Sequence, residues 1–422
     1  MKNTIITSIV LFSMSLLVTG SLNAQKLQYF RPNGMQGLDV FETPKTTDYE
    51  FDGLKVWVGG AYALQFQGIT QENAAGNLVD LNKNFNLGTG NLDLNVQLED
   101  GVRMHMRTFL SSRHHNEAWV KDGYIQIDKL DFIREGFARA IMEKVTIKVG
   151  HMEINYGDTH FRRSDNGQAL YNPFVGNYLM DSYTTEVAGE VYVQHKGLIA
   201  MLGLSNGRLN QSVTNDATKP AIYGKIGFDK QINSDLRLRL TGSAYSTSNT
   251  NRTYLYGGDR AGSRYYNILQ EVGGDGNDFA GRVNPAMNSS LTALVINPFI
   301  KYKGFEFLGV IENASGRTES ADEAFSGNRN WTQVGAEALY RFGSREQLYI
   351  GARYNNASGQ LPGEETNKVS VDRVNIGAGW YLTNNILTKI EYVSQNYNDY
   401  PTQMNENGAK FHGINIEAVV AF

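Results

Sequence analysis

Residues 91–98 read N-L-D-L-N-V-Q-L, a strict alternation of polar and apolar side chains. In an extended chain the four apolar residues point one way and the four polar residues the other, so the segment predicts a strand with two unlike faces. The turn signal E-D-G follows at 99–101. The alternation then resumes with Val102, Met104 and Met106. This stretch predicts a β-hairpin.

The same unit recurs along the chain and predicts sixteen strands, most of them about the 9–11 residues that a tilted strand needs to cross a bilayer, or slightly longer. The predicted strands are 54–67, 90–99, 101–110, 118–128, 145–155, 186–196, 197–206, 220–231, 235–247, 291–303, 304–314, 330–342, 346–357, 369–382, 386–396 and 411–422.

The connections between these strands alternate between short and long. The long ones are 68–89, 111–117, 156–185, 207–219, 248–290, 315–329, 358–368 and 397–410. Such sorting is typical of an outer-membrane barrel with short periplasmic turns and long extracellular loops. The predicted fold is therefore all-β, a transmembrane antiparallel β-barrel of about 16 strands. One periplasmic connection, 129–144, is long, and a short amphipathic helix is expected in it.

Composition agrees with a barrel and excludes several other classes. The chain has 422 residues, with 39 Lys and Arg against 43 Asp and Glu, so no basic excess favours nucleic acid. With no cysteine, disulfide scaffolds and thiolate metal sites are excluded. The mean hydropathy of −0.38 resembles that of a soluble protein. A barrel explains it, because only one face of each strand meets lipid, and barrels of 16–18 strands enclose an aqueous channel.

The two ends of the chain also carry signals. Residues 1–24 have the short basic start, apolar run and small-residue end of a secretory signal peptide. Residues 25–53 then form a short N-terminal periplasmic or lumenal segment, too short for the plug of a 22-stranded transporter, and 54–422 form the barrel. The chain ends on Phe422, and a terminal aromatic residue on an alternating strand resembles the signal read by the barrel assembly machinery.

In topology, the chain resembles the 16-stranded Gram-negative outer-membrane porins, general or phosphate-selective. Locally, V-G-H-M-E-I-N-Y-G at 149–157 is similar to the strand and glycine turn that introduce the third extracellular loop of the phosphate-selective type. The resemblance implies that the loop at 156–185 folds into the lumen as the constriction, while 248–290 is a long extracellular loop. It also implies a homotrimer in the outer membrane, in contact with the lipid bilayer and lipopolysaccharide.

The resemblance places five residues of this loop at the narrowest point of the pore. They are Asp158, His160, Arg162, Arg163 and Asp165. Strand parity points a second set toward the lumen as pore wall. These are Arg103, Arg107, Arg237, Arg239, Arg341, Arg353, Glu190 and Glu337. The predicted function is passive diffusion of small hydrophilic solutes and ions, with a mild anion preference. The alternative for both sets is ion pairing that supports the loop and the wall.

No motif of an enzyme or cofactor site stands in the context it needs. The one G-x-S-x-G, at 203–207, runs from a predicted strand into a loop and not into a helix. The chain has no phosphate-binding G-x-x-x-x-G-K, and His114, His115 and Glu117 lack the helical spacing of a zinc site. No catalytic activity, metal or cofactor is therefore expected. Two other functions stay open. One is a selective channel for hydrophobic compounds, resembling the fourteen-stranded fatty-acid transporters with an N-terminal hatch. The other is a barrel subunit of a surface protein complex.

Overall fold

The computed structural model describes residues 27–111, 118–207, 219–248, 250, 252–258, 262–276, 278–323, 327–364 and 366–422. The predicted signal peptide, residues 1–24, lies outside the described residues. Within the described part, no helix is long and apolar enough to cross a membrane.

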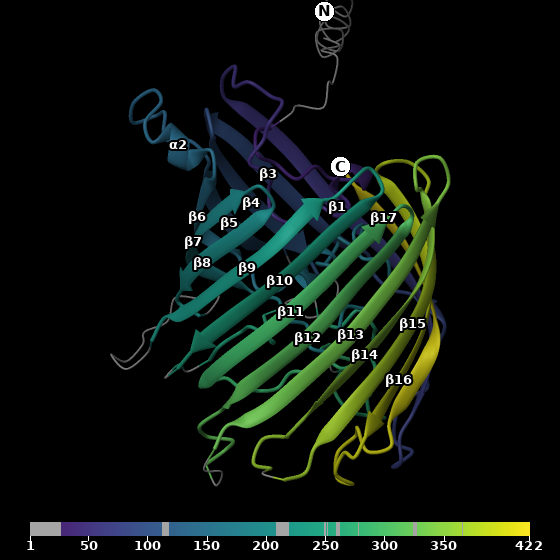
Figure 1. Ribbon diagram of the computed structural model, residues 1–422. Helices are drawn as coiled ribbons and strands as arrows, with labels where there is room; N and C mark the ends of the chain where they lie inside the picture. The colour runs from purple at the N-terminus through teal and green to yellow at the C-terminus, as the bar shows by residue number, and fades with distance from the viewer. Residues whose placement is uncertain are drawn as a thin grey trace, which may run out of the picture.

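The chain forms a closed antiparallel barrel of sixteen long strands (Figure 1). The strands are β1 (Lys55–Glu72), β3 (Thr89–Glu99), β4 (Val102–Leu110), β5 (Ala118–Ile127), β6 (Val145–Glu153), β7 (Thr185–His195), β8 (Leu198–Ser205), β9 (Ala221–Gln231), β10 (Leu236–Thr247), β11 (Ser290–Tyr302), β12 (Phe305–Arg317), β13 (Arg329–Phe342), β14 (Leu348–Gly359), β15 (Val369–Tyr381), β16 (Ile386–Asn398) and β17 (Lys410–Ala421). Each strand pairs with its neighbours in sequence, and β1 closes the ring by pairing with β17. Closure gives every strand a neighbour on both sides, as a sheet in hydrocarbon requires.

All sixteen predicted strands are present, and most bounds agree within two residues. The largest difference is in β1, which continues to Glu72, well past the predicted end at residue 67. A two-residue strand, β2 (Asn84–Phe85), pairs with this extension and was not predicted. The helix expected in 129–144 is reduced to α2 (Arg139–Met142), because Gly136 and Ala138 adopt positive φ angles of 70° and 53° that interrupt helical geometry.

The barrel is inside-out relative to a soluble protein. In β3, Leu92 faces outward with 56% of its surface exposed, while Asn95 faces inward with 0% exposed. The same alternation of exposed apolar and buried polar residues runs along the other strands. The outer surface is therefore an apolar belt suited to lipid, and the lumen holds the polar groups.

The two ends of the barrel differ in their connections. At one end, called here the short-turn end, six connections have two to five residues, and the connection of residues 128–144 is the exception. The other end carries the long loops. Residues 154–184, between β6 and β7, form the longest fully described loop and are called the inward loop, since almost all of their side chains are buried inside the barrel.

A second segment also enters the barrel. Residues 27–53, called the N-terminal strap, run across the short-turn end before β1 and contain the short 3-10 helix η1 (Met35–Gly37). The backbone N–H of Met35 donates to the carbonyl of Asn384 in the β15–β16 turn at 2.7 Å. Farther along, Phe41 packs against Phe299 of β11 and Leu308 of β12. The strap is thus fixed to the wall at several points.

Candidate functional site

The inward loop is a buried irregular segment, and its backbone groups need hydrogen-bond partners. Inward side chains of the wall supply them. Lys389 of β16 donates to the carbonyls of Ala169, Asn172 and Phe174 at 2.8–3.0 Å. Glu391 accepts from the backbone N–H of Val175 at 2.8 Å. The polar side chains of the inner wall therefore fix the inward loop by hydrogen bonds to its backbone.

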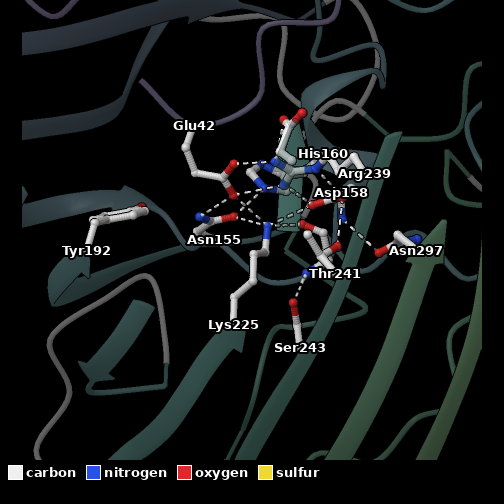
Figure 2. Close-up of polar contacts among 12 residues, drawn as sticks. Glu42, Asn155, Asp158, His160, Tyr192, Lys225, Arg239, Thr241, Ser243 and Asn297 are labelled. Atoms are coloured by element: carbon white, nitrogen blue, oxygen red, sulfur yellow. Dashed lines mark hydrogen bonds and ion pairs between the residues drawn. The ribbon is translucent and has the colours of Figure 1, made fainter. Parts of the chain in front are cut away.

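Asp158 of the loop is 0% exposed and contacts three strands of the wall (Figure 2). Its carboxylate accepts from Arg239 at 2.8 Å and from Thr241 at 2.7 Å, both on β10, and from Lys225 on β9 at 3.0 Å. Its backbone N–H donates to Asn297 of β11 at 2.9 Å. Burial raises the pKa of Asp158, but Lys225 and Arg239 outweigh burial and hold that pKa well below its usual range.

The N-terminal strap enters the same cluster. Glu42 accepts from Arg239 at 2.7 and 3.0 Å and from Lys225 at 3.3 Å, so it shares both cations with Asp158 (Figure 2). Burial raises the pKa of Glu42, and the opposing effect of Arg239 and Lys225 brings it down to about 2. Asp39 of the strap behaves oppositely. Burial and the nearby Glu306 raise its pKa in spite of Arg162 and Lys301.

A second cluster joins the loop to β12, β13 and β14. Arg162 donates to Glu306 at 2.9 Å and lies 3.3 Å from Glu337. Each of these carboxylates has a further arginine, since Arg341 contacts Glu306 at 2.6 Å and Arg353 contacts Glu337 at 2.6 Å. In this half of the wall, the acidic side chains bridge the loop cation and the wall cations.

The opposite half of the wall pairs with the loop through Asp165. Its carboxylate contacts Lys121 of β5 and lies 3.3 Å from Arg107 of β4, which also donates to Asp93 at 2.7 Å. Lys121 and Arg107, with Arg163, hold the pKa of Asp165 far below its usual range against the effect of burial.

Beside Asp165 lies a cavity of about 200 Å³, bounded by the strap, the inward loop and the inner faces of β3–β7. Five Arg and Lys side chains line it, of which Arg107 and Arg163 are paired with Asp93 and Asp181. The other three are Arg31 of the strap, Arg103 of β4 and Lys148 of β6. Within the described part of the chain none of the three forms an ion pair with a carboxylate. Arg103 contacts the oxygens of Asn95, Gln126 and Tyr29, and its buried Nε has no hydrogen-bond partner.

Each carboxylate that lines this cavity has, by contrast, a basic or histidine side chain beside it. Asp93 is paired with Arg107, while Asp122 lies 3.2 Å from His105 and Glu153 contacts His160. One buried oxygen of Asp122 accepts no hydrogen bond. Glu42 and Asp165 are held by the pairs described above. The cavity therefore holds three cations without a carboxylate partner among the described residues, an arrangement that attracts anions.

The predicted constriction residues divide between two settings. His160, Arg163 and Asp165 line the cavity, whereas Asp158 and Arg162 are enclosed in ion-pair clusters with the wall. Arg163 also pairs with Asp181 of the same loop at 2.5 Å. The role of the predicted constriction residues at the narrowest point of a pore stays a prediction.

The predicted wall residues all point inward, and most of them are paired. Arg237 contacts Asp229 at 2.7 Å, and Glu190 accepts from Tyr223 at 3.0 Å and from Tyr192 at 2.5 Å. Of the predicted wall cations, Arg103 has no carboxylate partner among the described residues. Arg31 and Lys148 were not singled out from the sequence, although Lys148 lies at an inward position of a predicted strand.

The remaining predicted sites lie elsewhere. Phe422 follows β17, and its backbone exchanges two hydrogen bonds of 2.9 Å with Gly60, while its ring is exposed. His114, His115 and Glu117 lie outside the described residues. Within the described part of the chain, no group of three or more His, Asp and Glu side chains is placed to hold a metal ion.

Comparison with known proteins shows which solved structures share this fold. No family model matches the chain, and none of the curated proteins does. Among solved structures, the chain is similar to an anion-selective porin from Comamonas acidovorans, with 12% identity, a TM-score of 0.53, and coverage of 87% of this chain and 100% of that one. The OmpT loop L8 deletion mutant of Vibrio cholerae, an outer-membrane protein, gives 10% identity, a TM-score of 0.51 and coverage of 88% and 100%. The chain has the fold of the outer-membrane porins. Salmonella typhi OmpF, in a complex with daunomycin, agrees, with 10% identity, a TM-score of 0.51 and coverage of 88% and 98%.

Proposed function

We propose that this porin-fold protein resides in the outer membrane and lets small hydrophilic solutes diffuse passively through its lumen, with a mild preference for anions. The observation that carries the proposal is the cavity lined by Arg31, Arg103 and Lys148, cations without a carboxylate partner in the described structure. In a low-dielectric barrel interior, such groups lower the energy of a passing anion and raise that of a cation. A similar solved structure is described as an anion-selective porin, which is consistent with this reading.

The inward loop and the strap make the route narrow. The inward-facing side chains of Asn297, Asn355 and Asn415 are 0% exposed, because folded chain rather than water covers them. We therefore expect solutes of small size only, and a conductance below that of a barrel with an empty lumen.

Planar-bilayer recording tests the proposal. The purified protein should give discrete conductance steps, and a KCl gradient should give a reversal potential displaced toward that of chloride. A clear displacement toward potassium would contradict the anion preference while leaving a channel. A complete absence of steps, in protein that shows the heat-modifiable gel shift of a folded barrel, would contradict passive diffusion.

The filled lumen favours a second candidate, a barrel subunit of a surface protein complex. Lys389, Arg353 and Arg373 all donate to carbonyls of the inward loop, and such a loop is costly to displace. A folded barrel that is silent alone and co-purifies with a stoichiometric partner would support this candidate. The hydrophobic-compound channel is disfavoured, because the barrel has sixteen long strands and a polar inner wall.

We also propose a homotrimer, as the resemblance to porins implies. The apolar belt provides a surface through which the subunits could pack. Mass measurement in detergent distinguishes it from a monomer. Contact with lipopolysaccharide and recognition of Phe422 by the barrel assembly machinery also remain predictions. Phe422→Ala should lower the amount of folded barrel in the outer membrane without altering the channel that does form.

A further inference from the structure

One connection at the short-turn end has no role in the lumen. The other six have two to five residues, whereas residues 128–144 form a long excursion between β5 and β6, called here the foot. Figure 1 shows its helix α2 outside the barrel wall, beyond the ends of these strands. The foot therefore neither narrows the pore nor shortens the route between two strands.

The root of the foot is fixed. The backbone N–H of Asp128 donates to the carbonyl of Gly101 at 2.7 Å, and its carboxylate accepts from Lys45 of the strap at 2.7 Å and from Thr146 of β6 at 2.5 Å. Met142 of α2 is buried. The excursion is thus held against the barrel in a defined orientation.

The body of the foot presents large apolar side chains to its surroundings. Ile141 is 62% exposed. Phe132, Ile133 and Phe137 are also exposed. Four large apolar side chains within ten residues, at an exposed turn, are a costly arrangement in water, because each fully buried side chain of this size is stabilised by about 1.5–3 kcal/mol relative to exposure.

Charged side chains of both signs stand among these apolar groups, and the acidic ones are Asp131, Glu135 and Glu143. Arg134, Arg139 and Lys144 are exposed and, within the described residues, form no ion pair with a carboxylate. Long basic side chains beside apolar ones are typical of segments that lie in a membrane interface, where the stems follow the acyl region and the charges reach the phosphates.

The foot is continuous with the lipid-facing belt. Ile125 of β5 and Val149 of β6, exposed on the outer wall, belong to the two strands that the foot connects. We propose that the foot lies in the headgroup region of the periplasm-facing leaflet, with Phe132, Ile133, Phe137 and Ile141 inserted at the boundary with the acyl chains. It would fix the depth and tilt of the barrel on the β5–β6 side.

The absence of cysteine makes the test direct, because each introduced cysteine is the sole site for a nitroxide spin label. Labels at Ile133→Cys, Phe137→Cys and Ile141→Cys are compared in nanodiscs of phosphatidylethanolamine and phosphatidylglycerol. Ser344→Cys, in the β13–β14 turn, is the water reference, and Ile296→Cys, exposed on the belt in β11, is the lipid reference.

The readout is accessibility to oxygen, which concentrates in lipid, and to a water-soluble nickel chelate. The three foot labels should give oxygen-to-nickel ratios between those of the two references and well above that of Ser344→Cys. Ratios equal to that of Ser344→Cys would show a foot in water and overturn the proposal.

Protection from both reagents would mean that protein covers the foot, and it too would overturn the proposal. Spin–spin broadening would then identify a second copy of the chain as the cover. Because all labelled sites are exposed, folding should be retained, and the heat-modifiable gel shift verifies it for each variant. The result is independent of conductance, so it stands or fails separately from the proposed channel.

Discussion

The two halves of the inner wall use the same residue types for different purposes. On β9–β16, Arg239, Arg353 and Lys389 are each engaged by carboxylates or by carbonyls of the inward loop. On β4 and β6, Arg103 and Lys148 face a cavity and have no carboxylate partner in the described chain. Their neighbours Arg107 and Lys121 are engaged by Asp93 and Asp165, so this half holds cations of both kinds. A charge at an inward position of a barrel strand is therefore not in itself a pore charge. Such a side chain stabilises the loop when a loop group pairs with it, and it can contact a solute only when no such partner is present.

The largest loss of stability is expected in the β9–β16 half of the wall, whose cations are engaged by carboxylates and carbonyls. Arg239→Met leaves Asp158 and Glu42 with only Lys225 among the cations now near them, in a buried site. Removing one partner of a buried ion pair costs about 3–5 kcal/mol, because the remaining charge is left desolvated. Urea unfolding in lipid vesicles, followed by the fluorescence of the four tryptophans, should show a loss of this size.

The matched control is Lys303→Met. Lys303 lies in the β11–β12 turn, 3.8 Å from Asp235, and both side chains are largely exposed. An exposed pair contributes roughly 0–1 kcal/mol, so this variant should unfold almost as the parent does. Equal losses in the two variants would contradict the division between engaged and free charges.

The next effect concerns the strap. The pKa of Glu42 is lowered to about 2 from an ordinary value of 4.5, so its stabilising contribution is complete above pH 4.5 and is lost as the pH falls toward 2. Asp39 has the opposite sign, since its raised pKa means that its contribution is lost as the pH increases through that value. The attachment through Glu42 should therefore release only in strong acid.

Single-channel recording between pH 7 and pH 2 measures this release. The parent should keep a constant step down to about pH 4.5 and show larger or noisier steps below it. In Glu42→Gln the strap is already weakened, so the larger steps should be present at pH 7 and change little with acid. A pH response that persists unchanged in Glu42→Gln would assign it to another group.

Local sequence patterns predict the direction of a wall side chain but not its partner. The alternation that begins at residues 91–98 depends only on neighbours along the chain, so it predicted sixteen strands and the inward direction of Arg103 and Arg239. The difference between these two arginines depends on where the inward loop and the strap lie. Asp158 reaches Arg239 across a separation of 81 residues, and no local pattern encodes such a contact.

The role of Arg31 also could not be predicted from the local sequence. It stands in an irregular segment without periodicity, and it becomes a cavity residue only because the strap crosses the short-turn end beneath the inward loop. Similarly, the pattern in 129–144 indicated an amphipathic helix, but the positive φ angles at Gly136 and Ala138 confine helical geometry to α2. Periodicity predicts faces well, while the packing of loops within a closed barrel depends on the assembled wall.

The smallest loss of stability is expected at the cavity cations Arg103 and Lys148. Substituting them tests most sharply whether paired and unpaired wall cations differ in role. Arg103→Gln keeps polar contacts to Asn95 and Gln126 within reach but removes a lumenal charge that has no carboxylate partner among the described residues. No buried counter-charge is stranded, so the unfolding free energy should change by less than in Arg239→Met. The reversal potential in a KCl gradient should move by a few millivolts toward that of potassium.

Lys148→Gln should move the reversal potential in the same direction, and Lys303→Gln, at an exposed turn, should leave it unchanged. If Arg103→Gln instead destabilised the barrel as strongly as Arg239→Met and left selectivity unaltered, the cavity cations would be structural after all, and the two halves of the wall would not differ.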